Sequence, residues 1–395
     1  TRITGLTKEE YDKNRRQNKD AGRLGTDEQD KYILTFDKRL TDNLEFSSVV
    51  EYREREYKYN YSGKNDNPKY RKRNKDTDSF YTNAQLKYNY KEKSNLIFGG
   101  DYSKAKVKED TWSTSKKGEK KVYYQSHSDI DFEAIGGYIL NKYSYNNFIF
   151  TQGIRVEKNE FDEDKTTFNS SGEINSKKTG RTKDSPTNTN YELTANYLFD
   201  EDTSAFFSYN RVKRNPSLTE FSSWWEEKSP KKEAQTVDTF ELGTKTLIEN
   251  IYLAGSIFYI NGDKEIMYDP VNGTMVGSSF YNLNGKTERI GLELASEQYF
   301  DKLTLNQSVS YVNAEITKVG SVNKDAGETY LEKGDKVPMV SDWKITLGAD
   351  YKLTEKLSVG ANYTYNSGYE RRELAGNGEV PKTTKISGYG VTDAY

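Results

Sequence analysis

The sequence predicts an all-β protein that crosses a membrane as an up-and-down antiparallel β-barrel. About fifteen segments alternate apolar and polar residues with the period of a β-strand. Their connections alternate between short turns and long polar loops, and only 33% of the residues are hydrophobic while 30% are charged. That composition supplies too few hydrophobic residues to fill the thick cores of soluble domains. A barrel in lipid needs apolar residues on one face only.

Each predicted strand is a run in which every second residue is apolar or aromatic. These strands cover residues 30–38, 44–58, 78–90, 95–108, 128–141, 146–160, 188–199, 203–213, 237–248, 250–262, 285–299, 302–317, 342–353, 356–369 and 387–395. Many of them reach the 9 to 11 residues that a tilted strand needs to cross a bilayer.

The predicted connections are of two kinds that follow each other strictly along the chain. The short turns are "RLTDN", "YKEKSN", "NKYSYN", "FDEDT", "LIEN", "YFDK" and "LTEK". The long loops cover about 59–77, 109–127, 161–187, 214–236, 263–284, 318–341 and 370–386. Strict alternation places all short turns at one end of the sheet, as in bacterial outer-membrane barrels with their short periplasmic turns. Tyrosines recur near these turns, where a bilayer interface favours them.

The two faces of the predicted strands differ in polarity. In "WKITLGADY", Trp343, Leu347 and Tyr351 share one parity, and Lys344 and Thr346 share the other. In the same way we expect Tyr191, Leu193, Ala195, Tyr197 and Phe199 to face outward in "YELTANYLF", and Phe132, Ala134, Tyr138 and Leu140 in "DFEAIGGYIL". Apolar residues outside and charges inside are typical of a wet or plugged barrel surrounded by lipid.

Composition argues against several other classes of protein. No run approaches the roughly 18 apolar residues of a membrane helix, and the mean hydropathy is -0.98. The net charge of -2 argues against nucleic acid as the main partner. His127 is the only histidine and cysteine is absent, so the chain offers no Cys/His metal cluster and no histidine-based nucleophile pair. We therefore expect no enzyme activity, metal site or cofactor, and we interpret His127 as a solvated loop residue.

Four motifs follow one another in an order that resembles the TonB-dependent outer-membrane receptors, including siderophore receptors. The first is the stretch "RNPSLTEFSSWWEEKSPKKEAQTVDTFELGTKT" (214–246), followed by "SIFYINGDKEI" (256–266) and "YNLNGKTERIGLELASEQYF" (281–300). The last consists of "KVPMVSDWKITLGADYKLTEKLSVGANYTYNSGY" (336–369) with "ISGYGVTDAY" (386–395). The similarity is good from about residue 185 to the end and looser before it.

The resemblance implies a 22-stranded barrel that is filled by an N-terminal plug domain. Residues 1–395 would then be part of the barrel domain, with about five strands before Thr1 and about two after Tyr395, and the plug and last strands would be missing from this chain. The implied function is active import of a scarce chelate, a ferric siderophore, across the bacterial outer membrane, with energy delivered by the TonB complex through the plug. A passive outer-membrane porin and a secreted all-β adhesin are the alternatives.

The loop at 214–236 is the candidate ligand-binding segment. It begins with the cationic corner "KRNP", which contains Arg214, and it carries the adjacent Trp224 and Trp225. A cation can attract an anionic chelate and tryptophan faces can hold it, although such a pair can also simply pack a loop down. The basic runs "NPKYRKRNK" (67–75) and "KKGEKK" (116–121) are either solvated loop charge or contacts to anionic lipid headgroups of the outer leaflet and to the chelate.

Overall fold

The computed structural model describes eleven stretches of the chain. They are residues 13–14, 23–62, 70–113, 123–169, 173–178, 187–215, 234–268, 280–282, 285–318, 332–373 and 382–395. Among these residues, no helix is long and apolar enough to cross a membrane.

The described chain consists of β-strands. They are β1 (Arg23–Thr41), β2 (Leu44–Ser62), β3 (Tyr70–Lys91), β4 (Ser94–Ser113), β5 (Tyr123–Tyr145), β6 (Phe148–Phe168), β7 (Ile174–Lys178), β8 (Thr187–Leu198), β9 (Thr203–Arg214), β10 (Gln235–Ile248), β11 (Ile251–Asp263), β12 (Ile266–Tyr268), β13 (Phe280–Asn282), β14 (Lys286–Tyr299), β15 (Leu303–Lys318), β16 (Trp343–Thr354), β17 (Leu357–Asn366), β18 (Tyr369–Glu373), β19 (Lys382–Ile386) and β20 (Tyr389–Ala394).

Sixteen strands belong to one hydrogen-bonded sheet. The strands follow in the order β1-β2-β3-β4-β5-β6-β8-β9-β10-β11-β14-β15-β16-β17-β20, and β7 pairs with β6. The fifteen strands of this path correspond one to one with the fifteen predicted strands, so the predicted antiparallel up-and-down order is confirmed. Two small hairpins, β12-β13 and β18-β19, lie in segments that were predicted as long loops.

By contact density the chain divides into two compact units. Unit 1 contains residues 1–87, 98–137 and 157–187, and unit 2 contains residues 88–97, 138–156 and 188–395. Strands β3 to β6 run through both units, with their loop ends in unit 1 and their turn ends in unit 2. We use "turn end" for the end of a strand that meets a short turn, and "loop end" for the other.

In unit 1 the strands are much longer than the alternation of apolar residues predicts. β1 has 19 residues, whereas the prediction covered 30–38, and β5 has 23. Cross-strand ion pairs stabilise the extra length. Arg55 on β2 donates two hydrogen bonds to Asp27 on β1, at 2.7 and 2.6 Å, and Arg73 on β3 lies 2.6 Å from Glu109 on β4. Such pairs support a sheet that is polar on both faces, which a hydrophobic pattern cannot reveal.

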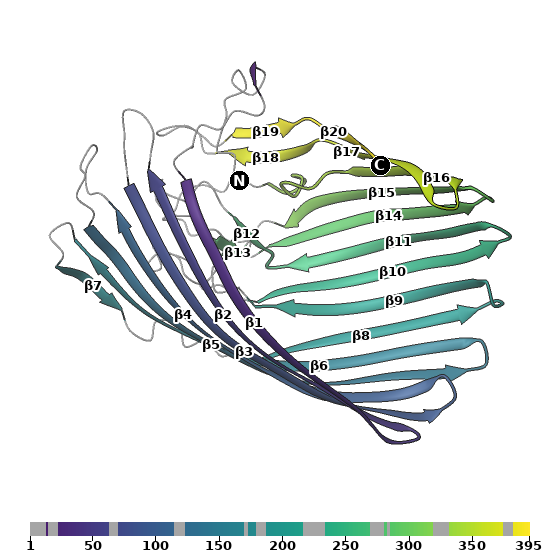
Figure 1. Cartoon of the computed structure of the whole chain (residues 1–395), viewed down its shortest axis with the longest axis horizontal. Coiled ribbons are helices and arrows are strands. Elements are labelled where there is room, and N and C mark those ends of the chain that lie inside the picture. The colour runs from purple at the N-terminus through teal and green to yellow at the C-terminus, as the bar shows by residue number, and fades with distance from the viewer. Residues whose placement is uncertain are drawn as a thin grey trace. The chain divides into compact units, whose positions relative to one another are not determined.

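In unit 2 the strand register defines two faces. Figure 1 shows β8, β9, β10, β11, β14 and β15 side by side in alternating directions, with the short turns together at one end. Directly paired residues share a face, and one such row crosses six strands from β9 to β16 as Phe207, Leu242, Ile257, Leu292, Tyr311 and Trp343. We call the side with this row the apolar face. The opposite side, the groove face, carries the row Gly243, Ser256, Glu293, Ser310 and Lys344.

The predicted faces are confirmed for β8 and β16. Leu193 is 47% exposed and Leu347 is 46% exposed, as expected of side chains that meet lipid. In β10 and β11, the first charged or amide residue on the apolar face, counted from the short turn, is Asp238 and Asn261, and in β14 the first charged residue is Glu288. Each lies about ten to twelve residues from its short turn, which is the length that a tilted strand needs to cross a bilayer.

The predicted outward face of β5 is wrong near its turn end. A Cβ placed on Gly153 of β6 would lie 3.1 Å from Leu140 and 3.4 Å from Glu192, so Leu140 shares the polar side of Glu192. Ile135 and Ile139 point the other way and are 59% and 51% exposed. Both parities of this strand are apolar, so the pattern by itself could not choose between them.

Candidate functional site

A polar groove lies on the groove face of β10 to β16. Its volume is about 560 Å³ and it contains two acids, Glu241 and Glu293, and two lysines, Lys245 and Lys344. Small side chains leave room for the groove, since Ala254, Ser256, Ala295 and Ser308 lie on this face. Mixed charges on a hollow surface suit the contact with a polar partner better than with lipid.

Two phenylalanine rings on the groove face lie over glycines, and one of them, Phe206, borders the groove. Phe206 lies over Gly243, where an added Cβ would be 2.6 Å from the ring, and Phe258 lies over Gly291 at 2.3 Å. An added side chain at Gly243 would have to move the Phe206 ring, and one at Gly291 would also meet the backbone carbonyl of Tyr311. The glycines thus leave space for both rings on this face of the sheet.

The predicted site residue Arg214 ends β9 at the loop end. It pairs in register with Gln235, the first residue of β10, and its side chain is exposed. The continuous ladder between β9 and β10 puts Arg214 on the groove face, on the same side as Ser208 and Glu241. Trp224 and Trp225 lie outside the described residues, so the structure does not bring the predicted trio together.

A nearby cation of β9, Arg211, is on the apolar face. Its Nε is 3.6 Å from Oδ1 of Asp238, which also accepts a 2.9 Å hydrogen bond from the hydroxyl of Tyr209. Arg211 is therefore engaged at the outer end of the apolar face, while Arg214 stands on the other side of the strand. Three residues apart in sequence, the two arginines meet different surroundings.

A second polar cluster closes the loop end of β11 and β14. Arg289 binds both carboxylate oxygens of Glu265 at 2.6 and 2.9 Å, and Thr287 donates a 2.7 Å hydrogen bond to the same carboxylate. The side chains of Arg289 and Glu265 are only 19% and 16% exposed, and Thr287 is fully buried. A bidentate pair with so little exposure fixes the start of the long loop that follows β11.

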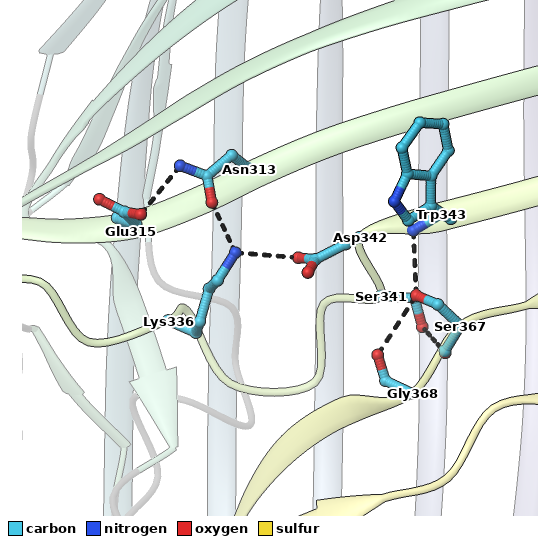
Figure 2. Close-up of polar contacts among 8 residues, drawn as sticks. All are labelled: Asn313, Glu315, Lys336, Ser341, Asp342, Trp343, Ser367 and Gly368. Atoms are coloured by element: carbon cyan, nitrogen blue, oxygen red, sulfur yellow. Dashed lines mark hydrogen bonds and ion pairs between the residues drawn. The ribbon is translucent and has the colours of Figure 1, made fainter.

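The segment at 332–342, which we call the strap, binds the loop end of β15. Val337 packs against Ala314 and Ile316 in a small apolar cluster, and its backbone N–H donates to the carbonyl of Ala314 at 2.9 Å. On the other side of the strap, Lys336 donates to Asn313 at 2.5 Å and lies 3.1 Å from Asp342 (Figure 2). Apolar packing and a charged hydrogen-bond network therefore hold opposite sides of the same segment.

The strap is also joined to the start of the next strands. Figure 2 shows Ser341 donating to the carbonyl of Ser367 at 2.9 Å, while the hydroxyl of Ser367 accepts the backbone N–H of Trp343 at 3.0 Å. Met339, with a left-handed φ of 65°, donates its N–H to the carbonyl of Glu370. The strap therefore connects β15, β16 and the start of the β18 hairpin at the loop end.

His127 lies in unit 1, about 18 residues from the turn end of β5 and thus beyond the bilayer-crossing part of that strand. Its two ring nitrogens are 2.8 Å from Asp110 and from Asp129. Burial lowers the pKa of His127, but hydrogen bonds to the two carboxylates and their charge outweigh it, so the pKa is raised above its ordinary value. The expectation of a solvated loop histidine is therefore wrong, because the strand extends through this region and places two acids beside the ring.

Within the described stretches, no group of three or more His, Cys, Asp and Glu residues could hold a metal ion. Both nitrogens of His127 are already engaged with carboxylates.

Sequence reasoning did not single out the Arg289–Glu265 pair or the strap. Arg289 lies in the motif "YNLNGKTERIGLELASEQYF", Glu265 lies in "SIFYINGDKEI", and most of the strap lies in "KVPMVSDWKITL", but no motif shows which residues meet across strands. Only the register brings Thr287 opposite Gly262 and Ile316.

An antiparallel sheet of this size, apolar on one face and polar on the other, with all short turns at one end, defines the class of transmembrane β-barrels. Residues 2–395 match the family described as TonB dependent receptor-like, beta-barrel. The chain belongs to this family, as its motifs predict. No curated protein matches the chain in sequence.

Solved structures of related fold agree with this assignment. The siderophore receptor PiuA from Acinetobacter baumannii is similar with a TM-score of 0.72 and 18% identity, over 94% of this chain and 58% of that one. The ferric citrate transporter FecA in its unliganded form is similar with a TM-score of 0.77 and 18% identity, over 99% of this chain and 57% of that one. The copper transporter OprC is similar with a TM-score of 0.69 and 13% identity, over 94% of this chain and 57% of that one. The chain thus spans less than two thirds of the length of these proteins.

Proposed function

We propose that residues 1–395 form part of one barrel domain of an outer-membrane receptor that imports a ferric siderophore or related chelate with TonB-transduced energy. The TonB complex acts through a plug domain, and the barrel lies in the bacterial outer membrane with its short turns in the periplasm. Membership in the TonB-dependent receptor family supports this proposal, and the proteins of similar fold include a siderophore receptor and a ferric citrate transporter.

The observation that carries the proposal is the position of Arg214. It stands at the loop end of the groove face, on the same side as the polar groove of about 560 Å³. A ligand that enters from the loop end meets this cation before it reaches the charged groove. An anionic chelate is the ligand whose charge a guanidinium at this place favours.

The test is a titration of the purified full-length receptor with a panel of ferric chelates, followed by tryptophan fluorescence. Arg214→Ala should weaken binding of the cognate chelate several-fold at low salt and less at high salt, because its contribution is Coulombic. Replacing Trp224 and Trp225 together by alanine should weaken binding about thirtyfold with little salt dependence, because their contribution is contact area.

Arg211→Ala is the matched control, since Arg211 lies three residues away on the opposite face. Equal losses for the two arginine variants would contradict the assigned side of the strand. Unchanged binding in the double tryptophan variant would move the site away from the loop at 214–236. Uptake that persists without TonB would instead identify a passive porin, and a receptor that stays soluble without detergent would identify a secreted adhesin.

A further inference from the structure

Three polar side chains on the apolar face of β14 and β15 form a closed hydrogen-bond group. The amide of Gln298 donates to the hydroxyl of Ser296 at 2.6 Å and to the amide oxygen of Gln307 at 2.9 Å. Gln307 returns a hydrogen bond to the oxygen of Gln298 at 3.1 Å. The register puts these residues on the same face as Leu294 and Val309, which is the face that meets lipid.

A shallow groove of about 400 Å³ begins at this group. Its surface is almost wholly apolar and comes mainly from the apolar-face residues Thr244, Leu253, Leu294 and Val309. Gly255 lies in the middle of the groove, where an added Cβ would be 2.9 Å from a methyl group of Leu294. The missing side chain at Gly255 therefore creates the depression.

The groove is oriented with respect to the bilayer. Ser296 and Gln307 lie about four or five residues from their short turn, and Gln298 lies closer still. Leu294 and Val309 are about two residues farther toward the loop end, which is toward the middle of a span of 9 to 11 residues. The polar end thus lies near the interface on the turn side, and the apolar body extends toward the centre of the membrane.

Two hydrogen-bond donors at the polar end have no protein acceptor among the described residues. They are the second amide hydrogen of Gln307 and the hydroxyl hydrogen of Ser296. Beneath the headgroups water is scarce, so a hydrogen bond that the protein leaves unmade is costly unless a lipid group makes it. The ligand that fits carries acceptors without donors at one end and a hydrocarbon chain behind them, which describes the glycerol ester region of a phospholipid.

We propose that this groove binds one phospholipid of the leaflet on the short-turn side, with an acyl chain along Leu253, Gly255 and Leu294. Its ester carbonyl accepts hydrogen bonds from Gln307 and Ser296. Assigning this leaflet to the periplasmic side rests on the membrane orientation of the proposed function.

The experiment is native mass spectrometry of the full-length receptor in detergent, with bound lipids counted and identified. The parent protein should retain one phospholipid. Gln307→Leu removes the donor, and Gly255→Val fills the depression at the cost of moving only the end of the Leu294 side chain. Each variant should lower phospholipid affinity about tenfold, the loss expected for one hydrogen bond or a blocked groove.

Gln152→Leu is the matched control. Gln152 on β6 lies at a similar distance from its short turn and accepts a 2.9 Å hydrogen bond from Asn141. This variant should keep the lipid, and all three variants should show the heat-sensitive electrophoretic shift of a folded barrel. Absence of a phospholipid from the parent, retention of lipopolysaccharide in its place, or equal occupancy in all three variants would overturn the proposal. Chelate titration of the same proteins is a separate readout, so loss of the proposed function and loss of lipid binding are distinguished.

Discussion

Leu347 and Thr346 are neighbours in β16 whose side chains meet different surroundings. Leu347 is exposed on the apolar face about eight residues from the short turn, while Thr346 borders the polar groove. Leu347→Arg should lower the free energy of unfolding by up to roughly 2 to 4 kcal/mol, because it puts a charge into lipid within the bilayer-crossing part of β16. Thr346→Arg should cost much less, since its charge stays in the polar groove. Equilibrium refolding of the full-length protein into bilayers measures both, and equal losses would contradict the two faces.

The strap shows how an element with little secondary structure is fixed at the loop end. Val337 packs against Ala314 and Ile316 and is only 4% exposed, whereas Lys333 of the same segment is exposed. Val337→Asp should release the strap, because a buried carboxylate without a partner costs more than this small cluster stabilises. Hydrogen exchange should then speed up at least tenfold at the amides of residues 316 and 337, which donate to backbone carbonyls in the folded strap. Lys333→Asp is the control, and if it accelerates exchange as much, the apolar contact is not what holds the strap.

For the whole molecule, the alternation of turns and loops predicts which segments reach the cell surface. The chain contains no cysteine, so each introduced cysteine is unique. Ser115→Cys and Asn323→Cys, in two long loops, should react with an impermeant thiol reagent on intact cells. Glu201→Cys and Glu355→Cys, in two short turns, should react only after the outer membrane is permeabilised. Strong labelling of either short turn on intact cells would contradict the common placement of all short turns at one end.

The sequence by itself determined the strands and their order, because a span of lipid imposes period-two alternation and a minimum strand length. All fifteen predicted strands of the sheet are present, and the seven short turns fall where "RLTDN" to "LTEK" placed them. The order of motifs also identified the family. The alternation of apolar and polar residues did not predict where the strands of unit 1 end, because ion pairs such as Arg55–Asp27 extend a sheet without any apolar residue.

Only the tertiary structure decided which residues meet. Both parities of β5 are apolar near its turn end, so the sequence pattern does not choose the side that faces lipid. The position of Leu140 beside Gly153 and Glu192 shows which side it is. The opposite placement of Arg211 and Arg214 follows from the register of β9 with β10, and the strap's anchor follows from the bridge between Glu315 and Lys336. Local sequence specifies the period of a strand, whereas the partner of each residue is set by backbone hydrogen bonds between segments that can lie far apart in the chain.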